Sequence, residues 1–144
     1  MWEDYHRSIG KIPPKKPVTE YFCDNRKDAD ELAELVDRGI KKATASSLWT
    51  LEKTDAPVRK IGDVFLITNW SGEAVCIVRI TKVTIKPYSE ITEAKARREG
   101  EGDKSLAYWR RMHQGYFERD LARFGLEFDE SMPVVFEDFE KVYP

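Results

Sequence analysis

The stretch that decides the fold of this chain and the place of its chemistry is Gly39-Ile40-Lys41-Lys42-Ala43-Thr44-Ala45-Ser46-Ser47-Leu48-Trp49. It follows residues 26–38, in which apolar side chains recur at helical spacing on one face. A glycine directly after such a helix lets the chain adopt a left-handed conformation and change direction. The next residues are small or polar, so Lys41 and Thr44 can be presented at the mouth of a pocket.

Lys41 and Thr44 stand three positions apart, which would place their side chains on opposite faces of a flat strand. They converge only if the chain turns between them, as a helix-to-strand connection allows. A lysine after a helix C-terminus more commonly complements the helix dipole and stays solvated. Taken alone, these residues mark a candidate site without identifying its chemistry.

Length and composition describe one folded domain. A chain of 144 residues can bury a single sizeable core, and 41% hydrophobic with 35% charged residues is typical of a globular protein. No apolar run could cross a bilayer and no signal peptide is recognisable, so we expect a cytoplasmic protein with no membrane partner. A formal net charge of -2 argues against holding long duplexes by phosphate neutralisation alone.

The two cysteines, Cys23 and Cys76, lie in strand-like surroundings with no Cys-x-x-Cys motif, and His6 and His113 are the only histidines. A zinc site is therefore not expected, and we predict reduced, buried thiols and no metal or cofactor.

The first half of the chain predicts two helices and several strands. We expect a short helix over the first eight residues, a proline-rich surface arm over 11–17, a strand over 19–23, a helix over 26–38 capped at 24–25 and closed by Gly39, and a helical turn at 48–51. A hairpin should join strands over 64–70 and 74–80, the second continuing or bending through residue 85.

The second half predicts two further helices and a closing strand. Thr92 should cap a helix over 93–99, which residues 100–103 end, and Asp103 should cap a long amphipathic helix that begins near Leu106 and ends at Gly125. His113 lies on its apolar stripe, which favours a structural histidine with its hydrogen bonds satisfied. Residues 133–143 alternate as a final strand, and the whole order predicts an α+β domain on a small mixed β-barrel.

Several motifs together resemble the ASCH domain family. The resemblance covers residues 21–143 and rests on Gly39-x-Lys41-x-x-Thr44, Gly62-Asp63, Ile91-Thr92-Glu93, Glu99-Gly100-Glu101-Gly102-Asp103, Ser105-Leu106-x-Tyr108-Trp109-Arg110, Val134-Val135-Phe136 and Val142-Tyr143. It implies a PUA-like β-barrel with flanking helices over residues 19–144, preceded by an N-terminal helix and arm over 1–18. This fold is associated with RNA metabolism.

The resemblance also implies an activity. Some members of the family are amidohydrolases that remove acyl groups from N4-acetylcytidine and related N4-acylated cytosines, and one is described as a ribonuclease. Their catalytic lysine, threonine and glutamate correspond to Lys41, Thr44 and Glu99 here, with Glu93 and Glu101 as neighbouring alternatives for the carboxylate. The chain has an additional loop over residues 100–103 and the arm before residue 21, which leaves the choice of substrate open.

Amide cleavage needs a nucleophile, a base and an acid, and a threonine hydroxyl is too weak a nucleophile unaided. We expect Lys41 to be a neutral base with its pKa lowered by a desolvated pocket, Thr44 to attack the acyl carbonyl, and Glu99 to protonate the departing nitrogen. Backbone N–H groups at residues 45–47 could stabilise the oxyanion. Candidate substrate-binding residues are Tyr21, Phe22, Ser46, Ser47, Trp49 and Trp70, with core packing as the alternative for Trp49.

Two alternatives remain from the sequence. In a metal-independent ribonuclease, Lys41 would stay charged on a phosphate, beside a basic lip made by Lys95, Arg97, Arg98, Lys104, Arg110 and Arg111; such a charge run is also typical of a solvated helix face. In a non-catalytic RNA-binding module, stacking and phosphate contacts would hold the RNA. The partner is therefore a modified cytidine nucleoside or RNA.

Overall fold

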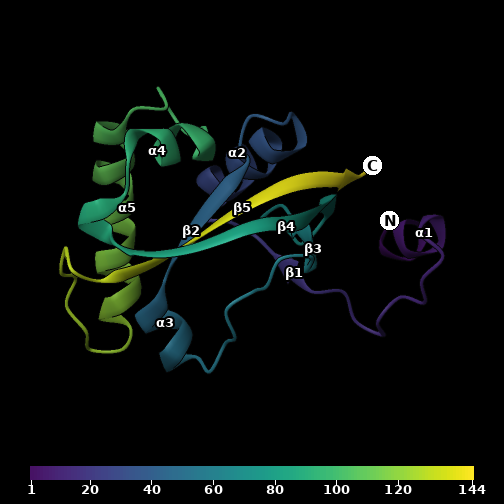
Figure 1. Ribbon diagram of the computed structural model, residues 1–144, viewed down its shortest axis with the longest axis horizontal. Coiled ribbons are helices and arrows are strands. Elements are labelled where there is room, and N and C mark those ends of the chain that lie inside the picture. Colours follow the sequence, from purple (N-terminus) through teal and green to yellow (C-terminus); the bar gives the residue numbers. More distant parts are fainter.

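The computed structural model describes residues 1–144 as an α+β domain on one mixed, five-stranded sheet, which is the predicted class (Figure 1). β1 lies parallel to β3, and all other neighbouring strands are antiparallel. The strands follow the order β1-β3-β4-β5-β2 and are β1 (Thr19–Glu20), β2 (Ala43–Ser47), β3 (Val64–Thr68), β4 (Ala74–Pro87) and β5 (Pro133–Tyr143). β4 is one continuous strand, as the sequence allowed, and joins β3 to β5.

Five α-helices surround the sheet: α1 (Trp2–Ser8), α2 (Arg26–Asp37), α3 (Leu48–Lys53), α4 (Glu93–Glu99) and α5 (Leu106–Ala122). All were expected within a few residues. The cap of α5 was not, because the Ser105 hydroxyl accepts from the Tyr108 N–H, while Asp103 accepts from the Ser105 N–H. The first strand is also shorter than predicted, since the chain turns at Cys23 with φ +65°.

The helices cover different parts of the sheet. Ala33 and Val36 of α2 pack on Phe65 and Ile67 of β3, while Trp2 of α1 packs on the opposite face of the same sheet. Helices α4 and α5 lie together beside the ends of β2 and β5, remote from α1 (Figure 1). Their core contains Ala96, Trp109, Phe117, Leu121, Ala43, Val134 and Phe136.

The connection from α2 to β2 makes the bend on which the site depends. Gly39 has φ +72°, and the backbone N–H groups of Ile40 and Lys41 both donate to the Leu35 carbonyl. Lys42 then leaves the turn by donating to the Arg98 carbonyl, at 2.9 Å, and accepting from the Phe139 N–H. Lys41 thus lies before the strand, so the alternation of a flat strand does not separate it from Thr44.

Both cysteines are free, as predicted; Cys76 is buried as expected, whereas Cys23 is only half-buried. None of the helices combines the length and the apolar character that a membrane span requires.

Candidate active site

A cavity of about 160 Å³ lies between α2 and α5 and is closed at its base by β2 and by the turn after α4. Three sequence-predicted residues from separate parts of the chain line it: Lys41 before β2, Thr44 within β2 and Glu99 at the end of α4. Their side chains are deeply placed, since the exposed fractions of the residues are 2%, 6% and 0%. Glu93, by contrast, is exposed and pairs with Arg97, so it is not the carboxylate at this cavity.

The base of the cavity holds a cluster of four charged or titratable side chains. Lys41 Nζ lies 2.8 Å from Glu101 Oε1 and 3.6 Å from Glu99 Oε2. Glu99 Oε2 also lies 3.0 Å from His113 Nε2 on α5. With Lys41 and His113 positive and both glutamates negative, the buried cluster carries no net charge, which is the condition for placing ions away from water.

The protonation of Lys41 differs from the sequence-based expectation. Burial alone would lower the pKa of its amine, but attraction to Glu101 and Glu99 outweighs burial and raises the pKa. The predicted neutral resting amine is therefore wrong. The amine stays charged because the turn after α4 brings Glu101 within hydrogen-bond distance of Lys41.

The two glutamates are shifted in opposite directions. Burial would raise the pKa of Glu99, but Lys41 and His113 attract its charge and lower that pKa well below its usual range. Burial, opposed by Lys41 and reinforced by repulsion from Glu99, raises the pKa of Glu101. Both oxygens of Glu99 are buried and neither has a hydrogen-bond partner of good geometry; Oε2 meets Lys41 and His113 as ion pairs, whereas Oε1 has no such partner. A buried carboxylate oxygen without a donor is costly, so a donor from water or from a bound ligand would stabilise it.

His113 is held rigidly at the back of the cavity. Its Nδ1 lies 2.9 Å from the Trp109 carbonyl oxygen, and its ring stacks on the Trp109 indole at 4.1 Å between centroids and 13° between planes. The prediction of a hydrogen-bonded histidine on the apolar stripe is thus confirmed. Its other nitrogen nevertheless faces Glu99 at the cavity, which the stripe did not indicate.

Two glycines place the carboxylates. Gly100 caps α4 with φ +69°, and a Cβ there would lie 2.4 Å from the Ile40 carbonyl oxygen. A Cβ at Gly102 would lie 2.4 Å from the Tyr108 ring. Because neither position has room for a side chain, the turn packs directly against the segment that carries Lys41, and Glu99 and Glu101 both reach its amine.

Aromatic and apolar side chains form part of the cavity wall, beside the charged cluster at its base. Among the predicted substrate-binding residues, Tyr21, Phe22 and Ser46 line the cavity, and the Phe22 ring centroid lies 5.0 Å from Lys41 Nζ. Ser47, Trp49 and Trp70 do not line it. Ser47 caps α3 and donates to Met132, Trp49 packs against the core as its alternative interpretation expected, and Trp70 meets Tyr21 edge-on at 5.3 Å.

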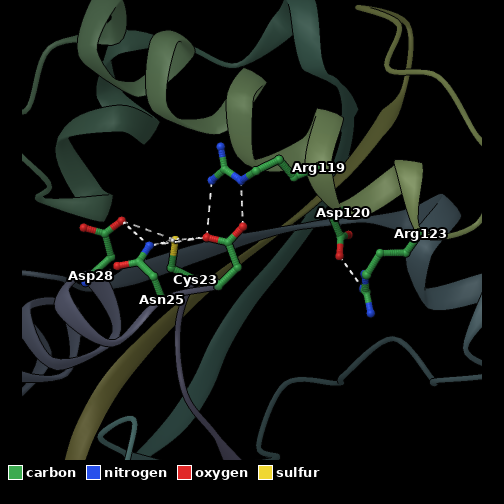
Figure 2. Close-up of polar contacts among 7 residues, drawn as sticks. Cys23, Asn25, Asp28, Arg119, Asp120 and Arg123 are labelled. Carbon is green, nitrogen blue, oxygen red and sulfur yellow. Dashed lines mark hydrogen bonds and ion pairs between the residues drawn. The ribbon is translucent and has the colours of Figure 1, made fainter.

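Further polar side chains line the outer part of the cavity, where Arg119 of α5 reaches across to the 23–28 turn (Figure 2). Arg119 Nε lies 2.7 Å from Asp24 Oδ2, and Asn25 donates to Asp28 at 2.8 Å. The Cys23 thiol lies within this network, and burial with the neighbouring carboxylates raises its pKa to about 12. A thiol that stays protonated at neutral pH is not a nucleophile. Arg123 and Asp120, also drawn, pair beside this network.

Glu99, Glu101 and His113 each offer a ligand atom, and these atoms lie within 4.8 Å of one another. That spacing suits a divalent ion, but the Lys41 ammonium already lies beside both carboxylates and supplies the positive charge that they require. We therefore assign no metal to these residues.

None of the six cations of the predicted basic lip lines the cavity. Arg97 and Arg98 pair with Glu93 and Asp138, and Arg111 lies over the Tyr108 ring. The cavity itself is acidic: five acidic residues line it together with three cations, Lys41, Arg119 and the imidazolium of His113, each already paired. The acidic residues are Glu20, Asp28, Glu31, Glu99 and Glu101.

Sequence reasoning assigned no role at the cavity to Tyr108, Met112, Tyr116 and Arg119. These four residues are spaced three or four positions apart along α5, which places them on one face of the helix beside His113. That spacing was the signal in the sequence that could have identified them.

Comparison with known proteins identifies the family. The model of the ASCH domain matches residues 19–143, and the chain belongs to this family. A solved ASCH domain from Lactobacillus crispatus JV V101 is 34% identical, with a TM-score of 0.89 over 99% of this chain and 91% of that one. The fold is thus the PUA-like one that the motifs implied.

Two other solved structures are similar. A protein from Enterococcus faecalis V583 is 29% identical, with a TM-score of 0.90 over 99% of this chain and 85% of that one. A hypothetical protein at 19% identity and a TM-score of 0.53, over 78% of this chain and 93% of that one, shares the fold alone. A search of curated proteins found no match.

Proposed function

We propose that this ASCH domain protein is an amidohydrolase that removes the acyl group from N4-acetylcytidine or a related N4-acylated cytosine nucleoside. The observation that carries the proposal is the meeting of Lys41, Thr44 and Glu99 in one buried cavity. The buried, unpartnered Oε1 of Glu99 adds to it, because a substrate N–H in the cavity would supply the missing donor.

The first chemical step is activation of Thr44. Lys41 begins as an ammonium, and Glu101 Oε1, at 2.8 Å and with a raised pKa, receives its proton when a ligand displaces water from the cavity. The resulting amine takes the hydroxyl proton of Thr44 as the oxygen attacks the acyl carbonyl. β2 is the last strand of the sheet, so alternate backbone N–H groups of residues 43–47 face away from β5 and can donate to the oxyanion.

The second step is departure of the cytosine. The tetrahedral intermediate collapses to an ester on Thr44 as the C–N bond breaks, and Glu99, once it has received a proton from a neighbouring group, gives that proton to N4. Water then attacks the ester, losing its proton to Glu99, and the released Thr44 oxygen recovers the proton held by Lys41. Glu101 then returns to Lys41 the proton that it took at the start. Each residue thereby returns to its starting protonation state.

The charges of the cavity favour a nucleoside over a nucleic acid. A ribonuclease of the predicted kind would need Lys41 free to neutralise a phosphate, but its charge is already matched by two carboxylates. A phosphate would also enter a cavity lined by five acidic residues. A neutral acylated base, stacked on Phe22 or Tyr21, meets no such penalty.

The experiment compares Thr44→Val with Thr84→Val. Both changes replace a hydroxyl by a methyl group of similar shape; Thr84 lies on β4 outside the cavity, and its hydroxyl is buried without a partner. With N4-acetylcytidine as substrate, we expect Thr44→Val to lower kcat by about 10²-fold or more and Thr84→Val to leave it unchanged. Cytidine and acetate are followed by chromatography.

A structured RNA is incubated in parallel. Full activity of Thr44→Val would remove the nucleophile assignment. Absence of deacylation by the wild type together with RNA cleavage would favour the ribonuclease, and RNA binding without turnover of either substrate would favour a binding module.

A further inference from the structure

The pKa of Glu99 conflicts with its role as a simple acid. A carboxylate whose pKa is held well below the usual range by Lys41 and His113 is ionised at neutral pH and carries no proton to donate. The proton that reaches the departing nitrogen must therefore come to Glu99 from a neighbour. The two cationic groups within 4 Å of Glu99 Oε2 are His113 Nε2, at 3.0 Å, and Lys41 Nζ, at 3.6 Å, and Glu101 also interacts with the Glu99 carboxyl group.

The hydrogen bond at Nδ1 fixes which hydrogens His113 carries. The Trp109 carbonyl can only accept, so the Nδ1 that lies 2.9 Å from it bears a hydrogen. Nε2 then either donates to an ionised Glu99 as part of an imidazolium or accepts from a protonated Glu99. These two states differ by the position of one proton between Nε2 and Oε2, and stacking on Trp109 keeps the ring oriented for the transfer.

We propose that His113 is a positioning residue that supplies, through Glu99, the proton taken by the departing nitrogen. Resting imidazolium and carboxylate become neutral imidazole and carboxylic acid when the Nε2 proton moves to Oε2, and Glu99 passes a proton to N4 as the C–N bond breaks. In the hydrolytic step, the proton that Glu99 takes from water returns to His113. This role rests on the proposed amidohydrolase function, but the protonation of His113 can be measured without turnover.

The charged groups around His113 give the direction of its pH dependence. Burial would lower the pKa of the imidazole, but Glu99, and more weakly Glu101, raise it, while Lys41 opposes them. The imidazolium therefore persists above pH 6.5, the ordinary range for histidine, and is lost as the pH rises through the raised value. A step that needs this proton should slow on the alkaline side of the pH profile.

The chain contains a matched control. His6 on α1 is also buried, and its Nδ1 lies 2.9 Å from the carbonyl of Trp2 four residues earlier, with its ring beside the Trp2 indole. No carboxylate forms an ion pair with His6, whereas Glu99 lies at Nε2 of His113. The difference between the two histidines thus isolates the contribution of the carboxylate.

The first measurement is ¹⁵N NMR of the imidazole nitrogens in the wild type, His6→Asn and Glu99→Gln, the His6 variant serving for assignment since these are the only two histidines. We expect both nitrogens of His113 to be protonated at pH 7 in the wild type, and Nε2 to lose its proton in Glu99→Gln. An unprotonated Nε2 of His113 at pH 7 in the wild type would overturn the proposal, whether or not the protein deacylates any substrate.

The second measurement is the pH profile of kcat for His113→Gln and His6→Gln, with folding checked by urea unfolding. We expect His113→Gln to lower kcat by about 10²-fold, to leave KM within about twofold and to lose the alkaline limb of the profile. His6→Gln should keep that limb. An alkaline limb retained in His113→Gln would assign the proton to Lys41 or Glu101 instead. Absence of activity in the wild type would defeat the proposed function while leaving the NMR result to stand.

Discussion

Lys41 is buried between two carboxylates, so its removal should affect folding as well as catalysis. Lys41→Met would leave Glu99 and Glu101 facing each other with one positive charge, His113, to balance them. Breaking a buried pair in this way costs about 3–5 kcal/mol. We expect urea unfolding at pH 7 to show a loss of that size for Lys41→Met and almost none for Lys42→Met, whose side chain is exposed.

Equal stability of the two lysine variants would mean that Lys41 does not compensate the buried carboxylates. For the same reason, inactivity of a Lys41 variant is weaker support for a catalytic role than inactivity of Thr44→Val, which keeps all four groups of the charged cluster in place.

Some residues of the site could be predicted from the sequence, and others could not. The spacing of Lys41 and Thr44 after a helix-closing glycine was enough to select two cavity residues. The charge state of Lys41 was not predictable, because it depends on a contact with Glu101 across 60 positions of the chain. Ser47 was expected to help orient the base, but it caps α3 instead. Trp49 was a candidate for stacking on the base or for core packing, and it packs against the core.

At the scale of elements, the turn after α4 fixes the position of Glu99 relative to Lys41. Gly100→Ala would place a Cβ 2.4 Å from the Ile40 carbonyl oxygen in addition to imposing a left-handed backbone on alanine. Gly72 has φ +83° but open space around its Cβ position, so Gly72→Ala imposes the backbone strain alone, about 1–2 kcal/mol. We expect Gly100→Ala to lose more stability than Gly72→Ala in urea unfolding and, unlike it, to lose deacylase activity as Glu99 and Lys41 move apart.

Gly100→Ala and Gly72→Ala with the same stability and activity would mean that the contact between residue 100 and Ile40 does not position the site.

The elements themselves were well predicted where periodicity was strong, as in α2 and α5. Their ends were less so, because capping depends on local geometry: Ser105 rather than Asp103 caps α5, and a left-handed residue at Cys23 ends the extended segment early. The convergence of α2, α4 and α5 on one cavity required tertiary packing that no local pattern specifies.

At the scale of the whole molecule, the distribution of charge decides between a nucleoside and a nucleic acid. The chain has a formal net charge of -2, and the cavity has five acidic residues against three paired cations. A protein that binds a nucleic acid through its phosphates releases counterions, so its affinity falls steeply with salt. For single strands, the logarithm of the binding constant falls against the logarithm of the salt concentration with a slope of about −0.7 per phosphate contact. A neutral nucleoside releases no counterions on binding. We therefore expect KM for N4-acetylcytidine to change less than about twofold between 50 and 300 mM salt.

The matched comparison is the same N4-acetylated cytidine within a short single-stranded RNA. Its phosphates would face the carboxylates at the cavity, so we expect it to be deacylated with a lower kcat/KM than the free nucleoside at low salt. Added salt screens this repulsion beyond about 10 Å at 0.1 M, so the difference in kcat/KM between the two substrates should become smaller as the salt concentration rises. A kcat/KM that is higher for the RNA and falls with salt would show instead that surface cations, such as Lys82, Lys86 and Lys95 near α4, recruit the polymer despite the acidic cavity.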